Sequence, residues 1–176
     1  MGQEHRHTGI QRNFMAVVMI GHSKTVRLPG GYRPIRQSDI NKEFQSTDRK
    51  MRDYHLSYFY DWSRGDNNIV LVKESVRGVI DGVVMFRLVP NIEHPKTIVV
   101  EMLARNFASG GSSGAGYDLL AVIEHYIAYQ LGIERIDIEA VRELEGYYES
   151  LGYTPTGENY YDSSWKEIVN MSKKIK

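Results

Sequence analysis

A run of small residues, Ser109–Gly116 ("SGGSSGAG"), lies between two segments with strong secondary-structure signals. The preceding Thr97–Asn106 ("TIVVEMLARN") is a β-branched run typical of a strand. After the run, apolar residues recur at helical spacing: Leu119, Leu120, Val122, Ile123, Tyr126, Ile127 and Leu131. Gly132 ends this helix, and Ile133–Val141 alternates as a second strand. A domain linker would lack such structure on both sides, so the run is predicted to be a loop inside one strand–loop–helix–strand unit.

A glycine-rich loop at a helix N-terminus is typical of a phosphate-binding site, because free backbone N–H groups and the helix dipole attract anions there. A P-loop for ATP or GTP needs a lysine after the last glycine, whereas Tyr117 and Asp118 follow Gly116. The Rossmann pattern lacks its third glycine, because Leu119 stands there. Glu139 or Asp137 would be spaced correctly for a ribose contact, so a nucleotide-binding domain stays an alternative.

The rest of the chain predicts an α+β fold. Tyr32–Ile40 indicates a strand leading into a helix capped by Ser38 or Asp39, and residues 40–62 are compatible with a helix. Closely spaced β-branched runs predict an antiparallel meander of three strands, over Ile69–Ser75, Gly82–Val89 and Thr97–Asn106. Arg142–Tyr153 predicts a short helix, and the remainder one or two final strands.

Charge balance and the absence of cysteine exclude several classes of function. Basic and acidic residues number 22 each, so no net field attracts nucleic acid or an anionic membrane. Without cysteine there is no disulfide, thiolate metal site or cysteine nucleophile, and His5 and His7 have no third type of metal ligand nearby. No apolar run approaches the ~20 residues of a membrane span. We expect a cytoplasmic protein with no nucleic-acid or membrane partner and no bound metal.

The N-terminal residues differ in character from the rest. Residues 1–14 are polar and aperiodic and are predicted to be disordered, or a leader that precedes Met15. Phe14–Ile20 ("FMAVVMI") predicts a buried strand rather than a signal peptide, because it is short and lacks a cleavage site. Residues 15–176 have the length and apolar content of a single domain.

Two motifs together resemble the GNAT superfamily of N-acetyltransferases. The loop of that family reads Gln/Arg-x-x-Gly-x-Gly/Ala, and Gly111–Gly116 reads "GSSGAG". Its second signature reads Phe/Leu-Tyr-x-x-x-Gly-Phe/Tyr, and Tyr147–Tyr153 reads "YYESLGY". The order of the predicted elements agrees as well. The chain differs in having Gly111 at the Gln/Arg position, and Val141 and Leu144 where many members carry Asn and Ala.

The resemblance implies a mostly antiparallel mixed sheet flanked by helices, with its fourth and fifth strands splayed apart to admit acetyl-CoA as cosubstrate. These two strands would be 97–106 and 133–141. The pyrophosphate would lie on the backbone of Gly111, Ser112, Ser113, Gly114, Ala115 and Gly116. The pantetheine amides would pair like an added strand with the backbone of Leu103, Ala104, Arg105 and Asn106.

The resemblance also implies catalytic roles for two side chains. Tyr148, the tyrosine of the second signature, would protonate the departing thiolate, although packing in the core is its alternative. Glu101, the only acid in "TIVVEMLARN", is the candidate to take the proton from the amine, and an ion pair with Arg87 is its alternative. Arg105 is either a phosphate contact or a surface charge at the end of a strand.

The predicted activity is therefore acetyl-CoA-dependent N-acetylation of a primary amine, on a small molecule or a protein, by direct attack. The alternative is a GNAT-fold module that binds CoA without turnover. Ten acids against two bases in Asp118–Asp162 suit either a cationic acceptor or a solvated face. Tyr54, Tyr58 and Trp62 would form an acceptor pocket or ordinary core. Homodimers are common in the family, so a homodimer is left open.

Overall fold

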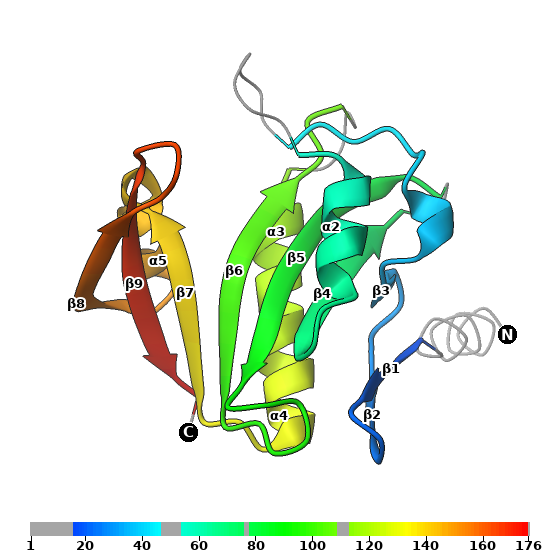
Figure 1. Ribbon diagram of the computed structural model, residues 1–176, viewed down its shortest axis with the longest axis horizontal. Coiled ribbons are helices and arrows are strands. Elements are labelled where there is room, and N and C mark those ends of the chain that lie inside the picture. Colours follow the sequence, from blue (N-terminus) through cyan, green and yellow to red (C-terminus); the bar gives the residue numbers. More distant parts are fainter. Residues whose placement is uncertain (1–15, 47–53, 76–77, 109–112, 176) are drawn as a thin grey trace, which may run out of the picture.

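A seven-stranded sheet forms the centre of the molecule (Figure 1). The structure, a computed structural model, describes residues 16–46, 54–75, 78–108 and 113–175. The strands follow the order β3-β4-β5-β6-β7-β9-β8. Their bounds are β3 Tyr32–Pro34, β4 Asn68–Glu74, β5 Ile80–Val89, β6 Thr97–Arg105, β7 Arg135–Val141, β8 Thr154–Tyr161 and β9 Glu167–Lys174.

All neighbouring strands in this sheet are antiparallel except β6 and β7, which run parallel. A parallel pair needs a crossover, and the predicted helix provides it as α3 Ala115–Val122, a wider π-turn η2 Ile123–Ile127 and α4 Ala128–Leu131. Gly132 ends this helix with φ +68°, as the sequence indicated. The mixed, mostly antiparallel α+β fold is confirmed.

Apolar side chains fill both faces of the sheet, under α3 and α4 on one face and under α2 Leu56–Ser63 on the other (Figure 1). The α3-side cluster includes Leu71, Val84, Phe86, Leu88, Ile98, Val100, Leu119, Ile123, Ile136, Ile138, Ala140 and Tyr148. The α2-side cluster consists of Ile35, Phe44, Leu56, Phe59, Val70, Val72, Ile80, Val83 and Met85. Alternate strand residues enter opposite clusters, because successive side chains of a strand point to opposite faces.

The segment before α2 differs from its prediction. Among the described residues of the helix-compatible stretch 40–62, the α-helix begins only at Leu56, and 47–53 lie outside the described residues. The preceding turn is a 3-10 helix, η1 Gln37–Asp39, with Arg36 as its N-cap instead of Ser38 or Asp39. The Asp39 carboxylate accepts the Arg36 N–H at 2.8 Å, so the third residue of the turn bonds back to its N-cap.

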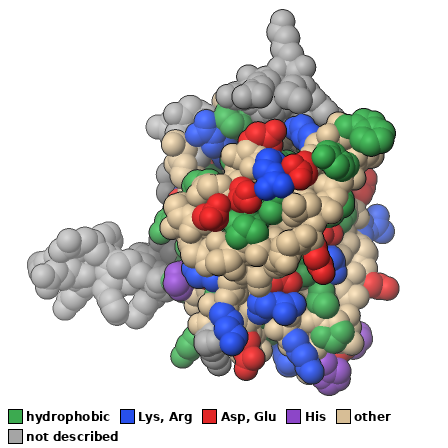
Figure 2. Space-filling model, turned by 90° about the vertical axis from the view of Figure 1, so that its left-hand side faces the viewer, with side chains coloured by type: hydrophobic (Ala, Val, Ile, Leu, Met, Phe, Trp, Pro, Cys, Tyr) green, Lys and Arg blue, Asp and Glu red, His purple; other side chains and the backbone are tan. Residues whose placement is uncertain are grey.

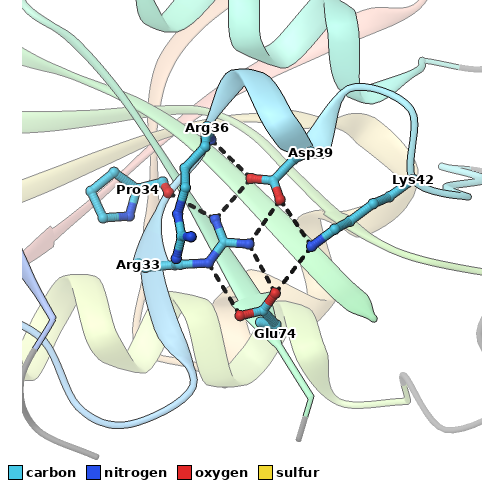
Figure 3. A network of polar contacts seen from close by, with 6 residues as sticks. All are labelled: Arg33, Pro34, Arg36, Asp39, Lys42 and Glu74. Atoms are coloured by element: carbon cyan, nitrogen blue, oxygen red, sulfur yellow. Dashed lines mark hydrogen bonds and ion pairs between the residues drawn. The ribbon is translucent and has the colours of Figure 1, made fainter. Parts of the chain in front are cut away.

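A buried ion cluster, the Arg33 cluster, holds this turn to the sheet (Figure 3). The guanidinium of Arg33 donates two 2.8 Å hydrogen bonds to the fully buried Asp39 and further bonds to Glu74 on β4. Lys42 contacts both carboxylates at 3.1 Å. Each acid therefore faces two cations, and the cluster fixes the chain that leads to residue 46.

The N-terminal strand is confirmed in part and has a partner that the sequence did not reveal. β1 Val17–Ile20 pairs with β2 Lys24–Arg27 in a separate two-stranded sheet. Val18 and Ile20 are buried, whereas Val17 and Met19 are exposed. Residues 1–14 lie outside the described part of the chain, so their predicted disorder is not tested. Among the described residues, no helix has the length and apolar character needed to cross a bilayer.

The remaining helices follow β7 directly. A 3-10 turn, η3 Arg142–Leu144, leads into α5 Glu145–Ser150, which is shorter than the predicted helix over 142–153. Gly152 follows with φ +96°, a conformation that glycine adopts without strain. This turn returns the chain to β8, which lies at the edge of the sheet beside β9.

Candidate active site

β6 and β7 diverge halfway along their length and form a fork (Figure 1). They pair only from Thr97 opposite Arg135 to Val100 opposite Ile138. Beyond that point β6 remains on β5, while β7 remains on β9. Glu101 on β6 and Glu139 on β7 are the first residues past the last pair, so both stand at the base of the fork.

A β-bulge at Glu101 accompanies the divergence. Met85 on β5 pairs with Met102 and the next residue, Phe86, pairs with Val100, which leaves Glu101 without a cross-strand partner on β5. Bulges bend a strand and re-aim its side chains, and they are frequent next to active sites. Here Val100 belongs to the α3-side cluster, while Met102 packs against the α2-side cluster.

The backbone of β6 beyond the bulge offers hydrogen-bonding groups to the fork. Asn106 donates its N–H to Asp81 C=O at 2.8 Å, on the β5 side. Backbone groups alternate in direction along a strand, so Ala104 also turns toward β5. Leu103 and Arg105 then direct their N–H and C=O groups into the fork. Of the four predicted pantetheine contacts, the geometry favours Leu103 and Arg105.

The side chain of Asn106 has a structural task at the end of β6. It is buried, and its amide donates to the carbonyls of Ile80 and Glu43. Its oxygen accepts the N–H groups of Gln45 and Ala108. Asn106 thus ties the segment behind the Arg33 cluster to the strand that ends at the glycine-rich loop.

The N-terminus of α3 meets the open arm of the fork. Gly114 has φ +87° and precedes the helix, where a side chain would be strained. The first helical hydrogen bond runs from Asp118 N–H to Gly114 C=O at 3.0 Å, so the N–H groups of Ala115, Gly116 and Tyr117 precede the helical ladder. A Cβ on Gly116 would lie 3.5 Å from Leu103, which shows how closely the two elements approach.

This arrangement fits the pyrophosphate of a CoA ester. Ser113 and Gly114 are exposed, Ala115 is buried, and a Cβ on Gly114 would meet no described atom within 4 Å. The acid in the first turn, Asp118, is hydrogen-bonded to Lys73 of β4, which offsets its charge near the anion site. The predicted contacts Gly111 and Ser112 lie outside the described residues.

Tyr148 lies on α5 in the α3-side cluster, on the other arm of the fork. It is 5% exposed and packs edge-on against Tyr147 and Tyr153, with ring centroids 5.2 and 6.3 Å away. Burial, assisted by Tyr147, raises the pKa of Tyr148 to about 12. The phenol is therefore fully protonated at neutral pH. Its ring packs in the core, as the alternative for Tyr148 predicted, and its role as proton donor stays a prediction. Its hydroxyl makes no hydrogen bond to another described side chain.

A buried polar network, missed in the sequence, positions α5. Tyr153 donates its hydroxyl to Glu124 at 2.9 Å, and Lys173 of β9 donates to the same carboxylate at 2.8 Å. Lys173 also donates to Leu151 C=O at 3.0 Å. Glu124 lies in the π-turn of the crossover helix and is 9% exposed. The sequence signal for this network was Glu124 itself, an acid within the apolar pattern of the predicted helix.

Three charged side chains gather at the base of the fork, on the face opposite α3. Arg87 of β5 lies between Phe86 and Leu88 of the α3-side cluster, so it points to the other face. Its Nε contacts Glu101 Oε1 at 3.2 Å, as the alternative for Glu101 predicted. Glu139 shares this face, because Ile138 and Ala140 are buried on the α3 side.

Glu139, which the nucleotide-binding alternative offered with Asp137 as a ribose contact, lies at the base of the fork. Its pKa is raised, first by burial and then by the negative charge of Glu101. Arg87 and the nearby Tyr160 hydroxyl of β8 act in the opposite direction. The position of Glu139 follows from the register of β6 and β7, which the sequence does not display.

Other predicted features have more ordinary surroundings. Tyr54 and Trp62 pack against the α2-side cluster, while Tyr58 is 41% exposed. Arg105 stacks over Phe107, with its guanidinium carbon 4.2 Å from the ring centroid.

On the face formed by β8, β9 and α5, acidic and basic side chains are intermixed (Figure 2). Arg142, for example, pairs with two acids. The acidic segment thus has cations beside it on this face.

Solved structures share this fold at low sequence identity. The ribosomal-protein alanine N-acetyltransferase of Escherichia coli is 14% identical with a TM-score of 0.62, covering 82% of this chain and 92% of that one. Ard1 from Thermoplasma volcanium is 13% identical with a TM-score of 0.61, over 81% and 95%. The spermidine/spermine N-acetyltransferase SpeG from Vibrio cholerae is 15% identical with a TM-score of 0.57, over 82% and 91%.

Comparisons at the level of sequence give no match. The sequence fits no protein-family model, and the search of curated proteins found no similar sequence. The similarity to N-acetyltransferases therefore lies in the arrangement of helices and strands and in the two motifs. The chain has the GNAT fold, as the loop and the second signature indicated.

Proposed function

We propose that the protein transfers the acetyl group of acetyl-CoA to a primary amine. The observation that carries the proposal is the fork, where unpaired β6 backbone lies beside the N-terminus of α3. Extended pantetheine amides would add to Leu103 and Arg105 like a short strand. The pyrophosphate would lie on the N–H groups that begin α3. The thioester would then lie at the base of the fork.

The two faces of the fork supply different chemistry. Glu101 and Glu139 stand on the face opposite α3, where an ammonium group is attracted by their charge. Tyr148 belongs to the cluster on the α3 face. A neutral amine would attack the thioester carbonyl from the acidic face, a C–N bond would form, and the C–S bond would break. Tyr148 would give its proton to the leaving thiolate and regain one from solvent.

The structural neighbours support transfer to an amine, but they do not define the acceptor. The printed name of one concerns spermidine and spermine, and that of another an alanine of a ribosomal protein. Both acceptors carry a cationic primary amine at neutral pH. A polyamine and an alanine-first peptide are therefore the two acceptor classes to test first.

The test has a binding step and a transfer step. Acetyl-CoA, CoA and NAD are titrated separately, and the two CoA species are expected to raise the melting temperature while NAD does not. Acetyl transfer to spermidine and to an alanine-first peptide is then followed by mass spectrometry. Binding without transfer to either amine would favour a CoA-binding module without turnover. A shift with NAD alone would return the loop to the nucleotide-binding reading.

A further inference from the structure

We propose that Glu139, rather than Glu101, is the general base that takes the proton from the acceptor's ammonium group. The inference rests on the proposed acetyl transfer and adds a catalytic residue that the two sequence motifs do not contain. Both carboxylates lie at the base of the fork, where β6 and β7 part. They differ in their partners, because Glu101 is ion-paired with a cation whereas Glu139 accepts from the neutral hydroxyl of Tyr160.

Glu101 is already engaged. Its Oε1 is 3.2 Å from Nε of Arg87, the cation on the neighbouring strand. A guanidinium cation held beside it offsets its charge, and Oε1 already accepts the hydrogen bond of Arg87. Glu101 therefore serves best as a fixed negative charge that attracts the ammonium group and acts on its neighbour across the fork.

Glu139 has the surroundings of a base. Burial and the charge of Glu101 both oppose its ionisation, so its pKa is raised above that of an exposed glutamate. The charged and titratable groups around it are Glu101 from β6, Arg87 from β5 and Tyr160 from β8. Across β9 it faces the neutral Asn170. Along its own strand Asp137 is paired with Arg135.

The ammonium group gives one proton to the Glu139 carboxylate, directly or through one water, and leaves a neutral amine. The amine nitrogen forms a bond to the thioester carbon and then loses its second proton to solvent. The C–S bond breaks, the thiolate takes the proton of Tyr148, and the phenolate regains a proton from solvent. Glu139 returns its proton to solvent before the next turnover.

The test compares pH profiles of kcat/KM for wild type, Glu139→Gln, Glu101→Gln and the exposed control Glu134→Gln on the far end of the same arm. Alanine-first peptide and spermidine serve as acceptors. Glu139→Gln should lose about 10²-fold at neutral pH. The loss should shrink at high pH, and earlier for the peptide, because an α-amine (pKa about 8) is neutral at lower pH than an alkyl amine (about 10). Binding of acetyl-CoA, measured by calorimetry, should stay unchanged.

Glu101→Gln carries the second half of the test. Removing the negative neighbour should move the acid limb of the profile to lower pH without abolishing it, because the charge that raises the proton affinity of Glu139 is gone. The proposal is overturned if Glu139→Gln keeps the wild-type acid limb, or if Glu101→Gln is the variant rescued by high pH. Wild type that binds acetyl-CoA but acetylates neither amine contradicts the proposed function itself, and the role of Glu139 falls with it.

Discussion

Two carboxylates in different halves of the sheet have opposite surroundings. Asp39 is fully buried, yet Arg33, Lys42 and the Arg36 N–H all donate to it (Figure 3). Burial alone would raise its pKa, but these donors outweigh burial and hold it at about 2. Glu139 is only half-buried. Its pKa is nevertheless raised, first by burial and then by the negative charge of Glu101. An acid surrounded by cations stabilises the fold, whereas an acid beside a second carboxylate and a neutral hydroxyl, at the base of the fork, is suited to proton transfer.

Disrupting the Arg33 cluster is expected to have the largest effect on the free energy of unfolding. Arg33→Ala leaves Asp39 buried without its main partner, and the loss of one member of a buried ion pair costs about 3–5 kcal/mol. Urea denaturation of wild type and variant measures the difference. A loss below about 1 kcal/mol would show that the Arg33 cluster is not a structural anchor.

Substitutions at the fork are expected to affect turnover instead of stability. Tyr148→Phe removes one hydroxyl from a packed ring and should lower kcat about 10²-fold, because the thiolate loses its proton donor. Tyr147→Phe is the matched control, since that side chain is 43% exposed and keeps its ring contact with Tyr148. Equal activity of the two variants in steady-state assays would exclude Tyr148 as the acid.

Replacing Asp39 or Glu139 by the corresponding amide should change the pH dependence of stability in opposite directions. The pKa of Asp39 is depressed, so its ionisation stabilises the protein above pH 3.8, and this stabilisation is lost as the pH falls to about 2. Asp39→Asn should therefore cost roughly 2 kcal/mol at neutral pH. The pKa of Glu139 is raised, so its ionisation opposes folding as the pH rises above 4.5.

Glu139→Gln should consequently be at least as stable as wild type at neutral pH, and no more stable than wild type in acid. Urea titrations at both pH values measure these differences. Destabilisation by Glu139→Gln as large as that by Asp39→Asn would mean that the two acids play the same structural part.

The smallest expected effect concerns the junction of α3 with the sheet. A Cβ on Gly82 would lie 3.0 Å from Ala115 Cβ and 3.1 Å from Ala104 O. Gly82→Ala should therefore push the start of α3 from β5, with a loss of about 1–2 kcal/mol and weaker binding of acetyl-CoA. Calorimetry compares it with Gly146→Ala, whose added Cβ would meet no described atom within 4 Å. Unchanged binding of acetyl-CoA would mean that the position of α3 against β5 does not affect the cosubstrate site.

Periodicity predicted the regular part of this molecule well. The β-branched run in Thr97–Asn106, the alternation in Ile133–Val141 and the apolar stripe up to Leu131 gave β6, β7 and the crossover helix close to their observed bounds. These signals are local, since each depends on which face of one element is buried. The two motifs, Gly111–Gly116 and Tyr147–Tyr153, indicated the fold through their resemblance to the GNAT family.

The features that periodicity missed depend on contacts between distant segments. The bulge at Glu101 appears only when β6 is laid against β5, and the position of Glu139 only when β7 is laid against β6. The capping of η1 by Asp39 depends on Arg33 and Glu74 from two strands. The described residues 40–46 are not helical and lie beside this cluster, because propensity is a weak preference that tertiary contacts override.

Residue-resolved hydrogen exchange with and without acetyl-CoA tests the central claim, that the open arm of the fork receives the cosubstrate. The account predicts that the amides of Leu103 and Arg105 gain protection on binding, together with those of Ala115–Tyr117. Ala104 and Asn106, which already turn toward β5, should change little. Protection that is absent from both groups, or spread evenly along β6, would contradict a strand-like cosubstrate in the fork.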